Sequence, residues 1–141
     1  YNHFVSRSKA PGAFDSRAND TGENNLFGTS TTDNNHFTIT AALHDSTANQ
    51  DVYVENAKIV TMMNPMNYLG SPAATNARFY RIRYGTADSN TSVAIPLIVG
   101  TRAQNLGYRV DMATPFDVDH SGDYDLEELF NWMDNIVKNG R

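Results

Sequence analysis

The sequence contains no cysteine and no long apolar run. The absence of cysteine excludes disulfides, catalytic thiols and cysteine-ligated zinc sites. The longest apolar stretch covers residues 93–100 and is interrupted by Pro96, so it is far shorter than the roughly 20 residues of a membrane span. Basic residues are also few: 11 Lys and Arg stand against 16 Asp and Glu, for a net charge of -5. We therefore expect neither nucleic acid nor a membrane as a partner.

The composition is that of a folded domain. The chain has 141 residues, of which 40% are hydrophobic and 19% charged, values typical of a globular protein rather than a disordered one. It begins at Tyr1 instead of methionine, and no charged-then-apolar leader follows. We therefore expect a piece of a longer polypeptide, and its cellular compartment is left open.

The two halves of the chain differ in composition and in the periodicity of their apolar residues. Residues 1–50 are rich in Asn, Asp, Ser, Thr and Gly, which predicts loops and short turns. A loop region of that length is expected to cover a site or to pack on another segment. Periodic apolar positions begin at Val52 and predict a helix that ends before Pro65.

The second half alternates between strand and helix patterns. We predict strands over residues 78–84 and 108–112, a helix from Thr91 or Ser92 to about Asn105, and an amphipathic helix over residues 126–137 that stops at Gly140. This order predicts α/β architecture with parallel strands. In such sheets functional groups gather at the carboxyl ends of the strands.

Asp88 and His120 are the candidate catalytic residues, because each lies in a loop after a predicted strand. A carboxylate that accepts a hydrogen bond from one imidazole nitrogen leaves the other free to take a proton from a nucleophile. The chain order of acid then histidine matches the end of the Ser, acid, His triad of α/β-hydrolases. The alternative is a surface aspartate and a loop histidine that never meet.

The nucleophile of such a triad is not in the sequence. No G-x-S-x-G nucleophile elbow occurs in these 141 residues. We therefore expect the catalytic serine on an upstream N-terminal segment or on a partner chain.

Residues 81–88 read RIRYGTAD, residues 91–96 read TSVAIP and residues 119–130 read DHSGDYDLEELF. These three motifs resemble the C-terminal end of bacterial tannases and of related feruloyl-esterase-like α/β-hydrolases. Residues 4–15 and 22–28 look like the late part of the lid insertion of these enzymes. The resemblance implies the C-terminal portion of an α/β-hydrolase fold preceded by the end of a lid insertion. Residues 1–65 would form the end of this lid or substrate-binding insertion, and residues 66–141 the C-terminal part of the core.

The resemblance also implies the roles of individual residues. Asp88 would be the triad acid and His120 the triad base of a serine esterase that hydrolyses galloyl or related phenolic esters and needs no cofactor or metal. Lys9 and Glu23 lie in the lid-like motifs and would bind the ring hydroxyls of the small phenolic ester substrate. A cationic donor and an anionic acceptor suit such hydroxyls. The alternative for this pair is a solvated lysine and a turn glutamate.

One position departs from the family pattern. Bacterial tannases carry a second aspartate two residues beyond the triad acid, where it binds a galloyl hydroxyl. The residue at that position here is Asn90. Because asparagine is uncharged and also offers a donor, a methoxylated ring, as in ferulate esters, becomes more plausible. The choice between gallate and hydroxycinnamate stays open.

Residues 117–128 also fit the spacing of an EF-hand calcium loop. Oxygen-bearing residues occupy the first, third, fifth and ninth places, Gly122 the sixth and Glu128 the twelfth. The entering helix is missing, however, because a strand pattern and Pro115 precede the loop. Because the spacing of the loop still fits, a non-catalytic calcium-binding module is kept as the alternative function.

Overall fold

The structure is a computed structural model that describes residues 15, 17, 18, 20, 24, 25, 35–46, 57–120 and 124–140. Its elements are α3 (Ile39–Leu43), α4 (Ala57–Met63), η1 (Pro65–Asn67), β1 (Phe79–Arg83), α5 (Ala94–Asn105), β2 (Arg109–Ala113) and α6 (Leu126–Asn139). In this part of the chain no helix combines the length and the apolar character needed to cross a bilayer.

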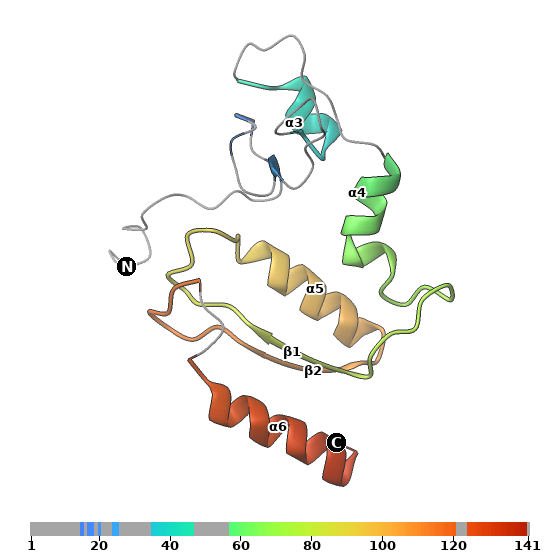
Figure 1. Ribbon diagram of the computed structural model, residues 1–141, viewed down its shortest axis with the longest axis vertical. Helices are drawn as coiled ribbons and strands as arrows, with labels where there is room; N and C mark the ends of the chain where they lie inside the picture. The colour runs from blue at the N-terminus through green and yellow to red at the C-terminus, as the bar shows by residue number, and fades with distance from the viewer. Residues whose placement is uncertain are drawn as a thin grey trace.

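The two strands pair in parallel, and the predicted α/β architecture is confirmed. The register runs from Phe79 opposite Arg109 to Arg83 opposite Ala113. α5 connects β1 to β2, and Figure 1 shows α5 and α6 on opposite sides of the strand pair. Both strands end on the same edge, where the loops carrying Asp88 and His120 begin.

The alternation of side chains along the strands determines what each helix contacts. Ile82 and Met112 are register partners and face α5. A Cβ atom added to Gly100 of α5 would lie 2.7 Å from Sδ of Met112 and 3.4 Å from Cδ1 of Ile82. The adjacent turn of α5 contributes Ala103, which is fully buried. Small residues on α5 thus allow the close approach that fixes the strand pair beneath it.

Local signals placed most boundaries within one or two residues. α6 ends at Asn139, just before the predicted stop at Gly140, whose φ of 62° forms a left-handed cap. Ser92 does act near the start of α5, since its hydroxyl accepts a hydrogen bond from the Ala94 amide at 3.3 Å. Pro96 lies in the first turn of α5, where no intrahelical bond is lost.

Among the described residues before α4, α3 is a helix that the sequence did not predict. α3 begins after Thr38, whose side chain accepts a hydrogen bond from the Ala41 amide at 3.2 Å. With only five residues, α3 has no apolar period that a sequence pattern could reveal. Of the helix predicted from Val52, the structure describes only α4; residues 51–56 are outside the described part.

A buried polar cluster holds the segment around α3. His36 is fully buried, with Nδ1 2.9 Å from Oδ1 of Asp15 and Nε2 2.8 Å from Oδ2 of Asp45. Asp15 also accepts hydrogen bonds from the amides of Phe37 and Thr38 through Oδ2. Burial alone would lower the pKa of His36, but the hydrogen bonds and charges of the two carboxylates outweigh it and raise the pKa.

Candidate active site

Asp88 and His120 meet at the carboxyl ends of the two strands. Nδ1 of His120 lies 2.9 Å from Oδ2 of Asp88, although 32 positions separate the residues. The Asp88 side chain is only 5% exposed, whereas that of His120 is 56% exposed. The pair therefore has a buried carboxylate at one end and an accessible imidazole at the other.

The second carboxylate oxygen of Asp88 is held by backbone amides. Oδ1 accepts hydrogen bonds from the amides of Asn90 at 2.7 Å and Thr91 at 2.9 Å. Burial alone would raise the pKa of Asp88, but these amides and His120 outweigh that effect and lower it. An ionised carboxylate can only accept, so Nδ1 of His120 is the donor to Asp88, and the neutral imidazole with this tautomer has its lone pair on Nε2.

The turn that carries Asp88 is bound to the loop that carries His120. The Thr86 amide donates to the Pro115 carbonyl and the Ala87 amide to the Val118 carbonyl, each at 3.0 Å. The Asp117 amide donates to Oγ1 of Thr86 at 2.8 Å. These three bonds fix the start of the histidine loop relative to the acid.

A cavity of about 500 Å³ opens beside the pair. Its lining combines the two candidate residues with apolar groups from the strand end and from α5, namely Ile82, Arg83, Tyr84, Gly85, Asp88, Thr91, Ile95, Pro96, Val99, Asp119 and His120. An apolar wall next to an accessible imidazole can hold an uncharged organic group beside a proton acceptor.

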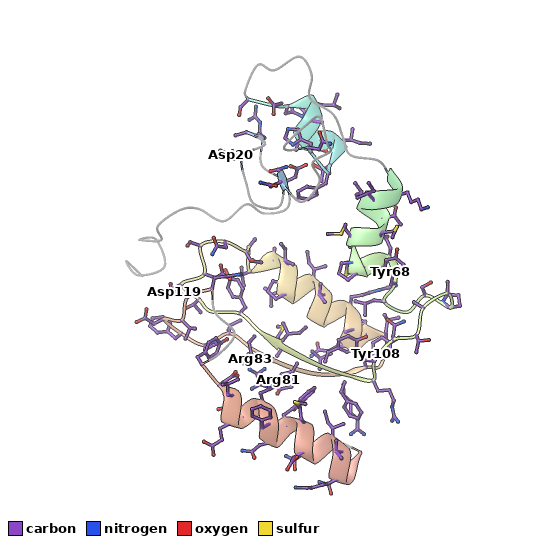
Figure 2. All side chains as sticks on the ribbon, in the orientation of Figure 1. Asp20, Tyr68, Arg81, Arg83, Tyr108 and Asp119 are labelled. Atoms are coloured by element: carbon purple, nitrogen blue, oxygen red, sulfur yellow. The ribbon has the colours of Figure 1, made fainter. Side chains whose placement is uncertain are left out.

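An ion-pair network lies behind the cavity, on the face opposite α5. Figure 2 shows Arg81 and Arg83 between the strand pair and α6. Nη2 of Arg81 donates to Oδ2 of Asp125 at 2.7 Å, and Nε of Arg83 donates to the same oxygen at 3.1 Å. Arg83 also binds the Asp111 carboxylate at 2.9 Å. The hydrogen bond from Arg81 is the largest cause of the lowered pKa of Asp125.

The remaining predicted site residues have different placements. Asn90 is exposed, and its backbone amide, rather than its side chain, holds Asp88. Lys9 and Glu23 lie outside the described residues, so their contact with the cavity stays a prediction.

The residues that support the Asp88–His120 pair were not predicted from the sequence. The bonds from the Asn90 and Thr91 amides could have been expected, because an aspartate side chain in a turn commonly accepts hydrogen bonds from the backbone amides two and three residues later. Arg81 and Arg83 alternate along a strand, which places them on one face. Their partner Asp125 is more than 40 positions away, and no local pattern indicates it.

The EF-hand-like residues are engaged in the same ion pairs. Asp125 and Glu128, in the ninth and twelfth places, both contact Nη2 of Arg81, at 2.7 and 3.4 Å. Among the described residues, which exclude 121–123, no group of three acidic, histidine or cysteine side chains could hold a metal ion. Calcium would thus compete with Arg81 for Asp125 and Glu128, which are two of the ligands expected in an EF-hand loop.

Comparisons with solved structures identify similar proteins. Tannase from Lactobacillus plantarum is 40% identical over 95% of this chain, with a TM-score of 0.81. Tannase from Fusobacterium nucleatum is 43% identical over 94% of this chain, with a TM-score of 0.78. A tannin acyl hydrolase in complex with ethyl gallate also matches, at 40% identity over 95% of this chain and a TM-score of 0.81. The predicted resemblance to tannases and the predicted hydrolase-type fold are confirmed.

The match covers only part of the similar proteins. The chain spans about 28% of the length of each of these three solved chains. No family model matches the chain, and no curated protein does.

Proposed function

Because this chain is related to the bacterial tannases over part of their length, we propose that it forms part of a serine carboxylic ester hydrolase for phenolic acid esters. Asp88 is the triad acid and His120 the triad base. The observation that carries the proposal is the Asp88–His120 hydrogen bond beside an open, partly apolar cavity. The 40% identity to tannin acyl hydrolases supports ester hydrolysis as the reaction class.

With Nδ1 of His120 bonded to Asp88, Nε2 is the atom that accepts a proton in the acylation step. Nε2 takes the proton of the serine hydroxyl as Oγ attacks the ester carbonyl, and Asp88 stabilises the imidazolium that forms. The tetrahedral intermediate collapses when Nε2 gives this proton to the departing alkoxide, which leaves as the alcohol. The phenolic acyl group then remains bound to the serine as an ester.

Deacylation repeats the same proton path with water. Nε2 takes a proton from water, the hydroxyl attacks the acyl carbonyl, and the serine leaves with the proton that Nε2 returns. The products are the phenolic acid and the regenerated serine. His120 is exposed enough to reach both nucleophiles, whereas buried Asp88 contacts neither.

The acyl pocket is proposed to combine residues from both halves of the chain. Lys9 and Glu23 bind the ring hydroxyls, and the side chain of Asn90 also contacts the phenolic acyl group. This division corresponds to residues 1–65 as the end of a lid and residues 66–141 as the end of the hydrolase core. The tannin acyl hydrolase complexes with ethyl gallate and with 3,4-dihydroxybenzoate favour a galloyl-like acyl group.

Further polypeptide is proposed to supply the serine and to cover the apolar face of α6. Leu126, Phe130, Met133 and Val137 repeat at helical spacing on α6, and their exposed fractions range from 46% to 85%. An apolar stripe of this kind is normally buried in an α/β protein. An upstream segment or partner chain that carries the catalytic serine would bury it.

Replacement of His120 by alanine tests the proposal in the complete enzyme that contains this chain. Hydrolysis of methyl gallate and methyl ferulate should fall roughly 10³- to 10⁴-fold in kcat, as for loss of a triad member. His44→Ala is the matched control, because His44 is exposed and its Nδ1 bonds to the Thr40 carbonyl of the adjacent helix, far along the chain from His120. Near-normal turnover by the His120→Ala enzyme would exclude the triad assignment.

A further inference from the structure

The loop that carries His120 is attached to the rest of the site at both of its ends. It leaves β2 after Ala113 and enters α6 at Leu126. The start of this loop is bound to the acid turn by the amides of Thr86, Ala87 and Asp117. The other end of the loop, next to α6, has an attachment of its own.

That second attachment is Asp125, the residue just before α6. Its side chain is 13% exposed and accepts hydrogen bonds from Arg81 and Arg83 through one carboxylate oxygen, Oδ2. It makes no side-chain cap to its own helix, so its carboxylate serves the strand instead. Aspartate at this position would ordinarily cap the helix, and its use for a tertiary contact is therefore a departure that needs a reason.

The two arginines belong to the strand that leads to Asp88. Arg83 is the last residue of β1, five positions before Asp88. Its guanidinium is held in place by the Asp111 carboxylate and by the carbonyls of Ile82 and Asp111. The Arg81 side chain is only 7% exposed. Asp125 thus binds a preorganised pair of donors on the same strand that presents the triad acid.

We propose that Asp125 is a positioning residue for catalysis: its bond to Arg81 and Arg83 holds the far end of the histidine loop so that His120 stays on Asp88. The inference rests on the proposed function, since it concerns the same acid and base. Asp125 acts through His120 and does not itself line the cavity. Small misplacements of a catalytic group have large effects on rate, and this is why a residue outside the cavity can control turnover.

The test is Asp125→Asn in the complete enzyme, measured with methyl gallate. Asparagine keeps the size of the side chain but removes the charge that binds the arginines. We expect kcat to fall roughly 10- to 100-fold, with KM changed by no more than about twofold, because Asp125 does not line the cavity and Arg83, which does, keeps its bonds to Asp111. Asp134→Asn is the matched control: Asp134 follows Asp125 on α6, is exposed, and pairs with Lys138 one turn along the helix. This control should keep both parameters.

A double variant separates positioning from a general structural effect. In an Asp88→Asn background the acid–base pair is already broken, so adding Asp125→Asn should lower kcat by less than about threefold. The Nδ1 proton of His120 should give a low-field NMR signal in the parent enzyme. This signal should broaden or disappear in Asp125→Asn and persist in Asp134→Asn. An equal loss of kcat in both backgrounds would overturn the proposal, as would an unchanged kcat in the single variant.

Arg81→Gln keeps the test decisive if Asp125→Asn does not fold. It removes one of the two donors, and Arg81 is not part of the cavity lining. We expect a several-fold lower kcat with KM retained; full kcat in this variant would overturn the proposal. The proposed esterase function is tested separately, by His120→Ala and Asp88→Asn. If these two variants lose hydrolysis while the Asp125 variant is fully active, only the positioning role is wrong.

Discussion

Gly85 lies so close to the backbone of Val118 that a Cβ atom on Gly85 would overlap the Val118 carbonyl. This contact brings the turn that carries Asp88 against the loop that carries His120. The Ala87 amide binds the same carbonyl oxygen at 3.0 Å. Any side chain at position 85 must therefore move one loop away from the other.

We predict that Gly85→Ala lowers both stability and turnover. The overlap involves backbone atoms that cannot rotate away, so the variant should lose about 1–3 kcal/mol of folding free energy or more. It should also lower kcat, because the shift separates Asp88 from His120. Denaturant unfolding and methyl gallate hydrolysis measure the two effects. Gly107→Ala is the control: φ there is 82° with open space around the position, so it should lose stability but keep kcat.

We predict that Asn90→Asp raises the preference for gallate over ferulate. A carboxylate at this exposed position would accept from a ring hydroxyl, and a charge-assisted hydrogen bond is worth about 1.5–3 kcal/mol. The ratio of kcat/KM for methyl gallate to that for methyl ferulate should thus rise roughly 10-fold or more. The amide that holds Asp88 belongs to the backbone and is retained. Asn131→Asp, which adds the same charge on exposed α6, should leave the ratio unchanged, and an equal effect of both changes would refute a direct contact.

We predict that the stability of the segment around α3 depends on pH through His36. The pKa of His36 is raised above its ordinary value of 6.5, so its contribution is complete below that value and is lost as pH rises through the folded pKa. Asp15 has a pKa lowered from 3.8, because the hydrogen bonds from His36, Asn24 and Thr38 outweigh the opposing effect of burial. Its contribution is present above 3.8 and is lost as pH falls. The stability that this cluster contributes should be greatest at a pH between the ordinary pKa values of Asp15 and His36, 3.8 and 6.5.

The variant Asp45→Asn tests this pH dependence. It removes one of the two carboxylates that face His36 and keeps the shape of the side chain. An NMR titration of this variant should give a lower pKa for His36 than in the parent. As pH rises, the melting temperature of the variant should begin to fall at a lower pH than that of the parent. The exposed His44 provides a control, since His44→Gln should leave the profile unchanged. A His36 ring that is neutral at pH 6 in the parent protein would contradict the prediction.

We predict that calcium does not stabilise the protein. Asp125 and Glu128 are paired with Arg81, so binding would require breaking these contacts and leaving a nearly buried arginine without them. The melting temperature should be the same with millimolar calcium and with a chelator. A calcium-dependent increase that Glu128→Gln abolishes would instead favour the calcium-binding module.

Much of the fold and the central pair of the site could be predicted from the sequence. The parallel strands follow from the alternation of strand and helix patterns, and the end of α6 follows from Gly140. Asp88 and His120 could be paired because the carboxyl ends of parallel strands share one edge. These predictions succeed because period, caps and chain order are local properties that need no knowledge of distant contacts. The roles of Lys9 and Glu23 stay predictions.

Tertiary structure alone decided how the pair is held. Arg81 and Arg83 reach Asp125 across 44 and 42 positions, and His36 is enclosed by carboxylates 21 and 9 positions away. A charged residue in a sequence looks the same whether it is solvated or buried in a pair. Only the folded path of the chain brings its partner within hydrogen-bond distance, and the free energy of that contact depends on the burial that the same path creates.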